Sequence, residues 1–281
     1  MKTTRFVSRR HFLKAASTAS AAAPFLVPAR VWSAETPANA RLGMGFIGMG
    51  TQSRGLLGGF LSRNSVQVLA VCDVDTHRRD DAKRRVDKHN GNSACGAYND
   101  FREIIERKDI DAVCIATPDH WHAIPMLAAL RADKDVYCEK PLTHNIHEAV
   151  EVLKAVDANK RVLQTGSMQR SSNEFRVACE LVLNGVIGKV SRVECSFGDP
   201  GIPCDLGTEA AEPGLDWDRW CGPGPLRGYS SVLCPRGIHQ GFPAWRNYRE
   251  YGSGGVGDWG AHHLDIAQWG LGMDDSGPVE V

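Results

Sequence analysis

The chain has 281 residues, 42% of them hydrophobic, and its 33 basic and 33 acidic residues give a formal net charge of zero. A chain of this length and apolar content buries a sizeable core and is typical of two domains. Its balanced charge gives no reason to expect a nucleic acid or an anionic membrane surface as a partner. The two ends differ, because six basic residues but only one acidic residue lie in the first 40 positions.

Residues 1–40 have the pattern of an export signal. The pair Arg9–Arg10 stands in "SRRHFLK", and a short alanine-rich stretch follows it. This pattern resembles the twin-arginine signal, which exports folded proteins, so we expect a periplasmic location. No apolar run reaches the ~18–20 residues that span a bilayer, and we expect no stable membrane span after cleavage. Cleavage after Ser33 or after Ala40 stays open, and so does a disordered basic tail on a cytoplasmic protein.

The next part of the chain alternates short apolar runs with helical stretches. Runs without polar alternation predict strands covered on both faces, as in a parallel sheet. Asn145 and Glu148 form a capping pair, and the apolar residues that follow recur at helical spacing. We therefore expect a Rossmann-type, doubly wound α/β domain over residues 41–165. The expected strands are 42–47, 66–72, 112–116, 136–138 and 162–165.

The period changes near residue 190. In "VSRVECSF", Val193, Cys195 and Phe197 alternate with polar residues, which predicts an antiparallel strand with one wet face. A long stretch rich in Gly, Pro and Trp follows, and then a helix from about Trp259. We expect residues 166–281 to form a partial α+β domain with a largely antiparallel sheet. Because the chain stops at "SGPVEV", where another strand begins, we expect a C-terminally truncated domain.

The chain contains nine cysteines, an odd number with no C-x-x-C pair, so a zinc knuckle is not expected. Three of them end apolar runs, where a small thiol packs well: Cys72, Cys114 and Cys138. Three others lie in the loop-rich region, and two of them could form one disulfide: Cys204, Cys221 and Cys234.

A glycine turn directly follows the first expected strand. In "GMGTQSRG", Gly48 and Gly50 fit a G-x-G-x-x-G motif, although Ser53 takes the place of the third glycine. The helix that begins behind the turn favours a pyrophosphate. Asp73 ends the second strand, where a carboxylate takes ribose hydroxyls, so NAD is favoured. Arg78 and its neighbour Arg79 keep NADP open, and a turn that serves backbone geometry alone is the alternative.

Two further motifs end strands at the same edge of the sheet. "ATPDHWH" (116–122) and "YCEKP" (137–141) fall at the carboxyl edge, where open α/β sheets bind ligands. The ammonium group of Lys140 can stabilise a developing alkoxide on a substrate there. A surface pair of Glu139 and Lys140 is the structural alternative.

The motif "GDWGAHHLD" places polar residues on one helix face. Asp258, His262, Asp265 and Trp269 have the spacing i, i+4, i+7 and i+11. We expect Asp258 to orient His262, which then serves as a general base for a hydroxyl group. A helix-start carboxylate with a packed histidine is the alternative. A metal site is not expected, because His262 and the adjacent His263 point apart on a helix.

Some polar and aromatic residues keep two interpretations. In "TGSMQRSS", Gln169 and Arg170 leave the last parallel strand and either reach substrate or cap a helix. The loop-rich region holds Trp217, Trp220 and Trp245, for which a core position is favoured over stacking against a sugar.

Five features together make the sequence similar to the Gfo/Idh/MocA family, which includes glucose–fructose oxidoreductase and inositol dehydrogenase. They are "GFIGMG", Asp73, "TPDHWH", "CEKP" and "GDWGAHHLD", in family order. The resemblance implies that Lys140 is the signature active-site residue, that His122 lies near the nicotinamide, and that Asp258 and His262 are catalytic. Asp119 departs from the family, which often has Asn at this position. The expected cofactor contacts are Gly48, Gly50, Thr51, Asp73, Thr117, Pro118, His122, Glu139 and Lys140, and the expected substrate contacts are Gln169, Arg170 and His262.

The resemblance implies an NAD(P)-dependent oxidoreductase that transfers hydride between a sugar or polyol hydroxyl group and a tightly held cofactor. Export of a folded protein fits this prediction, because the cofactor is then loaded in the cytoplasm and carried out. Two alternatives stay open: an NAD-dependent glycosidase or lyase that oxidises C3 transiently, and a nucleotide- or sugar-binding module with little turnover. The resemblance also implies a homo-oligomer for a full-length relative.

Overall fold

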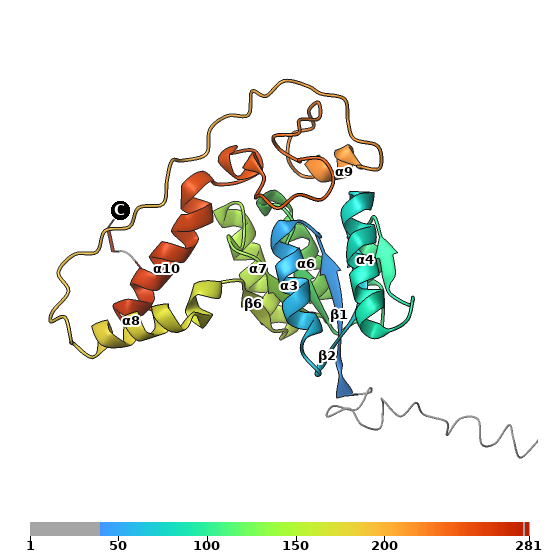
Figure 1. Cartoon of the computed structure of the whole chain (residues 1–281). Helices are drawn as coiled ribbons and strands as arrows, with labels where there is room; N and C mark the ends of the chain where they lie inside the picture. The colour runs from blue at the N-terminus through green and yellow to red at the C-terminus, as the bar shows by residue number, and fades with distance from the viewer. Residues whose placement is uncertain (1–39, 278, 281) are drawn as a thin grey trace, which may run out of the picture. The chain divides into compact units, whose positions relative to one another are not determined.

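A parallel sheet of six strands is the centre of the structure (Figure 1). The computed structural model describes residues 40–277 and 279–280, so the predicted export signal lies outside the described residues apart from its last position. The strand order is β3-β2-β1-β4-β5-β6, the order of doubly wound dinucleotide-binding sheets. The strands are β1 (Leu42–Ile47), β2 (Val66–Cys72), β3 (Gly96–Tyr98), β4 (Ala112–Ile115), β5 (Asp135–Cys138) and β6 (Leu163–Thr165).

Helices cover both faces of this sheet, as the uninterrupted apolar strands require. One core lies between the sheet and α3 and α4, with Phe46 and Leu57 fully buried. The other lies between the sheet and α5, α6 and α7, with Val113 and Leu130 fully buried. These helices are α3 (Thr51–Leu61), α4 (Thr76–Asn90), α5 (Phe101–Ile105), α6 (Ala123–Arg131) and α7 (Ile146–Asn159).

The start of α7 confirms the predicted capping pair. The Asn145 side chain accepts a hydrogen bond from the Glu148 backbone N–H (3.0 Å), which satisfies an otherwise unpaired donor of the first turn. The apolar stripe of this helix is nevertheless largely exposed, with Ile146 84% accessible. The helix buries Val152 and Ala155 instead, because these smaller side chains face the core beside α6.

Residues after β6 form short helices joined by long loops. The longest extended stretch runs from α8 toward α9 (Figure 1). A third core of aromatic and cysteine side chains, including Trp220, Leu233 and Tyr251, lies in this region. The helical elements are α8 (Asn173–Leu183), α9 (Trp217–Cys221) and α10 (Ala261–Gly270), with short 3-10 turns η3 (Asp119–Trp121), η4 (Met168–Ser171) and η5 (Ala244–Asn247), and the π-helical turn η6 (Val256–Gly260).

The predicted antiparallel strand near residue 190 is not formed. Residues 188–199 belong to no strand, and Val193 is 47% exposed. A strand needs a partner for its backbone ladder, and the described residues place none beside this segment. Residues 42–281 form one compact unit, so the division at 165/166 stays a prediction. Within the described residues, no helix is long and apolar enough to cross a membrane.

All nine cysteines fall within the described residues and are free thiols. The disulfide that Cys204, Cys221 and Cys234 left open is therefore not formed. The predicted burial of Cys72, Cys114 and Cys138 is confirmed, since none is more than 4% exposed.

Candidate functional site

The glycine turn after β1 has the geometry of a phosphate-binding turn. Gly48 has φ +83°, and a Cβ atom there would lie 2.8 Å from the Thr117 backbone nitrogen, so only glycine fits. A Cβ atom on Gly50 would meet no protein atom within 4 Å. The space in front of the α3 N-terminus is therefore open, and backbone N–H groups at such an end attract an anion. This space fits the pyrophosphate of a dinucleotide.

Asp73 follows β2 directly and is held by the backbone. Its carboxylate accepts hydrogen bonds from the N–H groups of Met49 (2.6 Å) and Asp75 (2.8 Å). Burial raises the pKa of this carboxyl group, while the positive charge of Arg78 and the two N–H groups lower it. Met49 lies between the two glycines of the turn, so the first hydrogen bond fixes Asp73 beside the expected pyrophosphate position.

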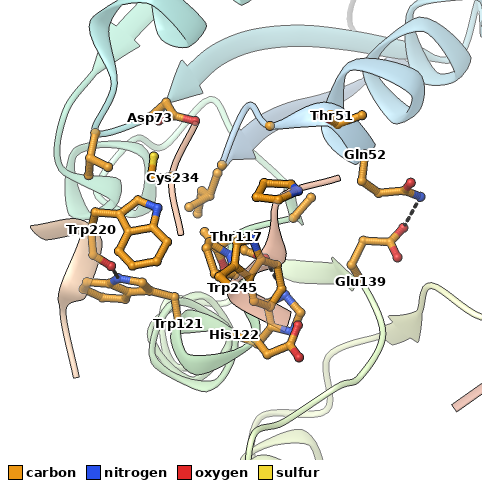
Figure 2. A pocket seen from close by; sticks show the side chains of 18 of the residues that line it. Thr51, Gln52, Asp73, Thr117, Trp121, His122, Glu139, Trp220, Cys234 and Trp245 are labelled. Carbon is orange, nitrogen blue, oxygen red and sulfur yellow. Dashed lines mark hydrogen bonds between the residues drawn. The ribbon is translucent and has the colours of Figure 1, made fainter. Parts of the chain in front are cut away.

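A cavity of about 520 Å³ begins at this turn and extends along the carboxyl edge of the sheet (Figure 2). Its volume lies within the range of cavities that bind small molecules and cofactors. Its far wall comes from the part of the chain after η4, including Trp220 of α9 and Trp245 of η5. It brings together eleven of the thirteen predicted site residues: Gly48, Gly50, Thr51, Asp73, Thr117, Pro118, His122, Glu139, Lys140, Asp258 and His262.

Lys140 and Asp258 meet at one end of the cavity. The Lys140 ammonium group donates to the Asp258 carboxylate and to the Asp258 backbone carbonyl (3.2 Å). The Nε atom of Arg246 lies 3.8 Å from the same carboxylate oxygen. Asp258 thus contacts two cations, and its charge offsets part of their positive charge.

The expected orientation of His262 by Asp258 is wrong in one respect, because the carboxylate points to Lys140. Asp258 lies in the π-helical turn η6, which precedes α10 and shifts the register that a continuous α-helix would give. His262 is 6% exposed and still lines the cavity. Burial lowers its pKa, the Lys140 charge lowers it further, and Asp258 opposes both effects. The imidazole is therefore neutral at pH 7 and able to accept a proton.

His122 is fully buried and connects two strand-end motifs. Its ring nitrogens face the carbonyl oxygens of Pro141 (2.7 Å) and Thr117 (2.9 Å). Burial lowers its pKa to about 4. A neutral imidazole donates to only one of these carbonyls, so the ring fixes the position of the "TP" turn against the "EKP" loop.

Glu139 joins the site to α3. Its carboxylate accepts hydrogen bonds from the Gln52 amide nitrogen (3.0 Å, Figure 2) and the Tyr137 hydroxyl group (3.3 Å). Glu139 thus has partners within the protein, and the surface pair of Glu139 with Lys140 is not formed. Lys140 pairs with Asp258 instead.

Gln169 and Arg170 do not line the cavity, in contrast to their expected contact with substrate. Arg170 pairs with Asp265 (2.8 Å) and Asp274 (2.7 Å), which attaches η4 to α10 and the turn after it. The Gln169 side-chain oxygen is buried without a hydrogen-bond partner. Met168 takes their place in the cavity wall.

Several residues of the site carried no sequence signal. Arg246 and the segment before it lie in a loop region without a helical or strand period, so no spacing marked them. Trp217, Trp220 and Trp245 all belong to the third core or pack against it, so the predicted core position is confirmed. The rings of Trp217 and Trp220 stack with their centroids 4.6 Å apart. Trp220 and Trp245 line the cavity as well. For Asp119, the sequence indicated only that the family often has Asn at this position. Its burial raises its pKa to about 8, against the charges of Arg246 and Lys140.

The described residues contain no group of side chains that could hold a metal ion. Across residues 40–277 and 279–280, no three His, Cys, Asp or Glu side chains converge to hold a metal ion. The adjacent His263 directs its Nδ1 atom to the Ser196 carbonyl (2.9 Å), away from the cavity.

The fold and this cavity define a dinucleotide-binding protein of the Rossmann class. The model of the Gfo/Idh/MocA oxidoreductase family, NAD-binding Rossmann fold, matches residues 42–167, and the model of its C-terminal alpha/beta domain matches residues 155–281. The chain belongs to this Gfo/Idh/MocA oxidoreductase family.

Individual relatives match shorter parts of the chain. An inositol 2-dehydrogenase of Rhodococcus jostii is 33% identical over 114 residues, 40% of this chain and 31% of that protein. A glycosyl hydrolase family 109 protein of Stenotrophomonas maltophilia is 29% identical over 237 residues, 76% of this chain and 50% of that protein. The myo-inositol 2-dehydrogenase structure from Lactobacillus plantarum is 28% identical with a TM-score of 0.49, over 53% of this chain and 43% of that one. The chain thus spans about a third of the inositol dehydrogenases and half of the hydrolase-family relative.

Proposed function

We propose that this protein is an NAD(P)-dependent oxidoreductase that acts on a hydroxyl group of a sugar or polyol. One observation carries the proposal: Lys140 and His262 line the same cavity as the open glycine turn and Asp73. The cavity therefore combines a nucleotide site with two side chains that can bind a hydroxyl group and take its proton. The similarity to inositol 2-dehydrogenases supports a polyol substrate.

Each side chain has a distinct role in this chemistry. A nicotinamide cofactor supplies the acceptor for the hydride that leaves the carbinol carbon. The neutral imidazole of His262 takes the hydroxyl proton, and Lys140 donates a hydrogen bond to the oxygen as negative charge develops on it. Asp258 holds the Lys140 ammonium group in place. When the cofactor is bound, the turn at Gly48 and Gly50 would hold its pyrophosphate, and Asp73 would bind its ribose hydroxyls.

The surroundings of Arg78 favour NAD over NADP. Its guanidinium group donates to the carbonyl oxygens of Pro235 (2.5 Å) and Gly237 (3.3 Å) and pairs with Asp75 (3.4 Å). A ribose 2′-phosphate near Asp73 has to compete with these partners for Arg78. Arg79, the second arginine after Asp73, is also paired, with Asp80 (3.0 Å).

A retained cofactor and export of the folded protein complete the proposal. The experiment is to denature the purified protein, with no cofactor added, and separate the released nucleotides by chromatography. We expect close to one NAD(H) per chain. A protein that is purified empty and binds added NAD weakly contradicts retention, and a protein that binds neither NAD nor NADP contradicts the proposed function.

Glycoside hydrolysis with a recycled nicotinamide cofactor is a second candidate. The match to a glycosyl hydrolase family 109 protein favours it, because that alignment covers 76% of the chain. Incubation with a panel of inositols, sugars and glycosides separates the two. An oxidised polyol with reduced cofactor supports the oxidoreductase, whereas a free sugar released without net change in the cofactor supports the hydrolase.

A further inference from the structure

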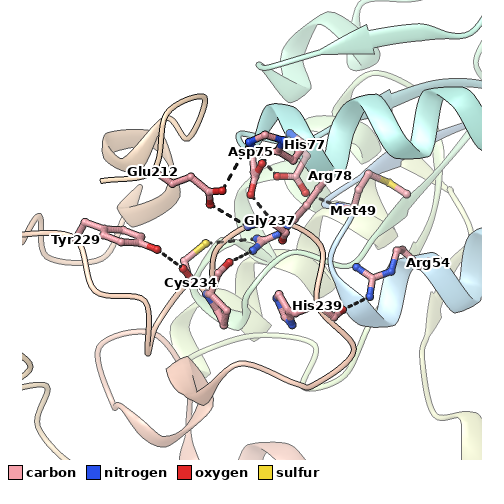
Figure 3. Close-up of polar contacts among 12 residues, drawn as sticks. Met49, Arg54, Asp75, His77, Arg78, Glu212, Tyr229, Cys234, Gly237 and His239 are labelled. Carbon is pink, nitrogen blue, oxygen red and sulfur yellow. Dashed lines mark hydrogen bonds and ion pairs between the residues drawn. The ribbon is translucent and has the colours of Figure 1, made fainter. Parts of the chain in front are cut away.

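A loop from the C-terminal part of the chain lies against the nucleotide end of the cavity (Figure 3). We call residues 234–243 the clasp. Cys234, His239, Phe242 and Pro243 contribute to the cavity wall, opposite the glycine turn and Asp73. The clasp follows the buried Leu233 of the third core and is followed by η5, which carries Arg246 to the Lys140 end.

Arg78 connects the clasp to α4. Its side chain is 7% exposed, and its guanidinium group donates to the backbone carbonyls of Pro235 and Gly237. The Nε atom that donates to Gly237 also lies 3.4 Å from the Asp75 carboxylate, which forms an ion pair with the guanidinium group. A buried arginine whose partners are mainly carbonyls of a distant loop is well suited to holding that loop in place.

Two residues of α3 connect the clasp to the glycine turn. The Arg54 guanidinium group donates to the carbonyl of His239, and the Thr51 hydroxyl group donates to the carbonyl of Gly241 (2.9 Å). The helix that would bind the pyrophosphate at its N-terminus is therefore also bound to the clasp.

The contacts follow a regular pattern along the chain. Every second carbonyl of the clasp accepts a hydrogen bond from a side chain of α3 or α4: those of Pro235, Gly237, His239 and Gly241. All four contacts are side chain to backbone, so they can break singly while both helices stay folded. The clasp is also held from the C-terminal part of the chain. The Tyr229 hydroxyl group donates to the Cys234 carbonyl (2.8 Å), and the Gly237 N–H donates to Glu212 (2.9 Å). The Arg236 guanidinium group donates to the Ala210 carbonyl (2.9 Å) and lies 3.8 Å from Glu209.

We propose that the clasp is the gate through which a dinucleotide enters and leaves, and that Arg54 and Arg78 are its latches. This inference rests on the proposed function and names how the cofactor is retained. A gate limits passage in both directions, so loosening a latch speeds both binding and dissociation. A residue that only contacts the nucleotide changes dissociation alone.

The test measures both rates for NADH on nucleotide-stripped protein by stopped flow, using energy transfer from Trp220 and Trp245 in the cavity wall. In Arg54→Ala we expect both rates to rise at least tenfold and Kd to stay within about threefold. Arg85→Ala is the matched control: Arg85 donates to the Arg54 backbone carbonyl (3.0 Å) without contacting the clasp, so its rates stay within twofold.

Each outcome is decisive. A rise in the dissociation rate alone, or no change in either rate, overturns the gate while leaving the proposed function in place. A wild-type protein that binds no NADH overturns both. Should Arg54→Ala not fold, trypsin on the wild-type chain decides, because Arg236 lies in the clasp with half of its side chain exposed. At least fivefold slower cleavage after Arg236 with saturating NADH supports the gate, and equal cleavage overturns it.

Discussion

Lys140 is the side chain on which the proposed chemistry depends most directly. Its side chain is 17% exposed and lines the cavity, and its ammonium group is held by Asp258. We expect Lys140→Ala to lower kcat by about 10²–10³-fold, the cost of removing one preorganised donor at a developing oxyanion. Nucleotide should stay bound, since the glycine turn and Asp73 are intact.

Steady-state kinetics and nucleotide content of the purified variant check this expectation. Lys154→Ala provides the comparison, because the Lys154 side chain is 67% exposed and pairs with Glu151 on the surface of α7, away from the cavity. Turnover of the Lys140 variant at the wild-type rate would remove Lys140 from the mechanism.

Asp119 makes stability depend on pH. Burial raises its pKa to about 8, so in the folded protein it is a neutral acid at pH 7, whereas in the unfolded chain it ionises near pH 4. Its contribution to stability is therefore complete below about pH 4 and is lost as pH rises toward 8. In Asp119→Asn the side chain cannot ionise, so the variant does not lose this stability as pH rises.

We expect Tm of wild type minus Tm of Asp119→Asn to fall steadily from pH 5 to pH 8. The comparison uses the difference in Tm because two histidines affect both proteins alike. Burial lowers the pKa values of His120 and His122 to about 4, so both proteins become more stable as pH rises toward 6.5, and this effect cancels in the difference. Parallel Tm curves for the two proteins would contradict the buried neutral acid.

The turn between β1 and α3 separates a folding role from a binding role. Gly48→Ala places a Cβ atom against backbone at positive φ and should destabilise the fold by about 1–3 kcal/mol. Gly50→Ala meets no protein atom and keeps an allowed backbone, with φ −68°, so Tm should stay within about 1 °C. Its methyl group enters the space expected for pyrophosphate, and NADH affinity should fall at least tenfold. Thermal unfolding and NADH fluorescence titration test the pair. Equal effects on stability would show that the turn serves backbone geometry alone.

Elements with a strong local pattern were predictable. Two apolar runs match β1 and β2 residue for residue, and the capping pair at Asn145 places the start of α7. β3 was not predicted because Gly96–Tyr98 is a three-residue edge strand without an apolar run. The segment near residue 190 alternates correctly but makes no ladder, since alternation says nothing about a partner strand.

The site divides in the same way. Motifs that follow strands were placed correctly at the sheet edge, because parallel topology brings strand ends together. The pairing of Asp258 with Lys140 was missed, since a π-helical turn changes side-chain direction without changing the sequence spacing. Arg246 and the clasp depend on contacts between residues far apart in the chain, such as Arg54 with His239, and local patterns do not encode such contacts.

At the scale of the whole molecule, the cavity joins the sheet edge to the part of the chain after η4, so a nucleotide bound in it would contact both. Binding to the folded state alone stabilises by about 2.7 kcal/mol at a free concentration of 100 Kd. For a chain of this size, that corresponds to a rise in Tm of about 5–10 °C. We expect nucleotide-stripped protein to show this rise when NADH is added. Gly50→Ala should lose at least about half of it at the same concentration, since a tenfold weaker affinity leaves only about 1.4 kcal/mol. Arg54→Ala should keep most of it, because a gate changes rates more than affinity. A Tm that does not move at saturating NADH would mean that the nucleotide binds the unfolded chain equally well or not at all, and would contradict the cavity as its site.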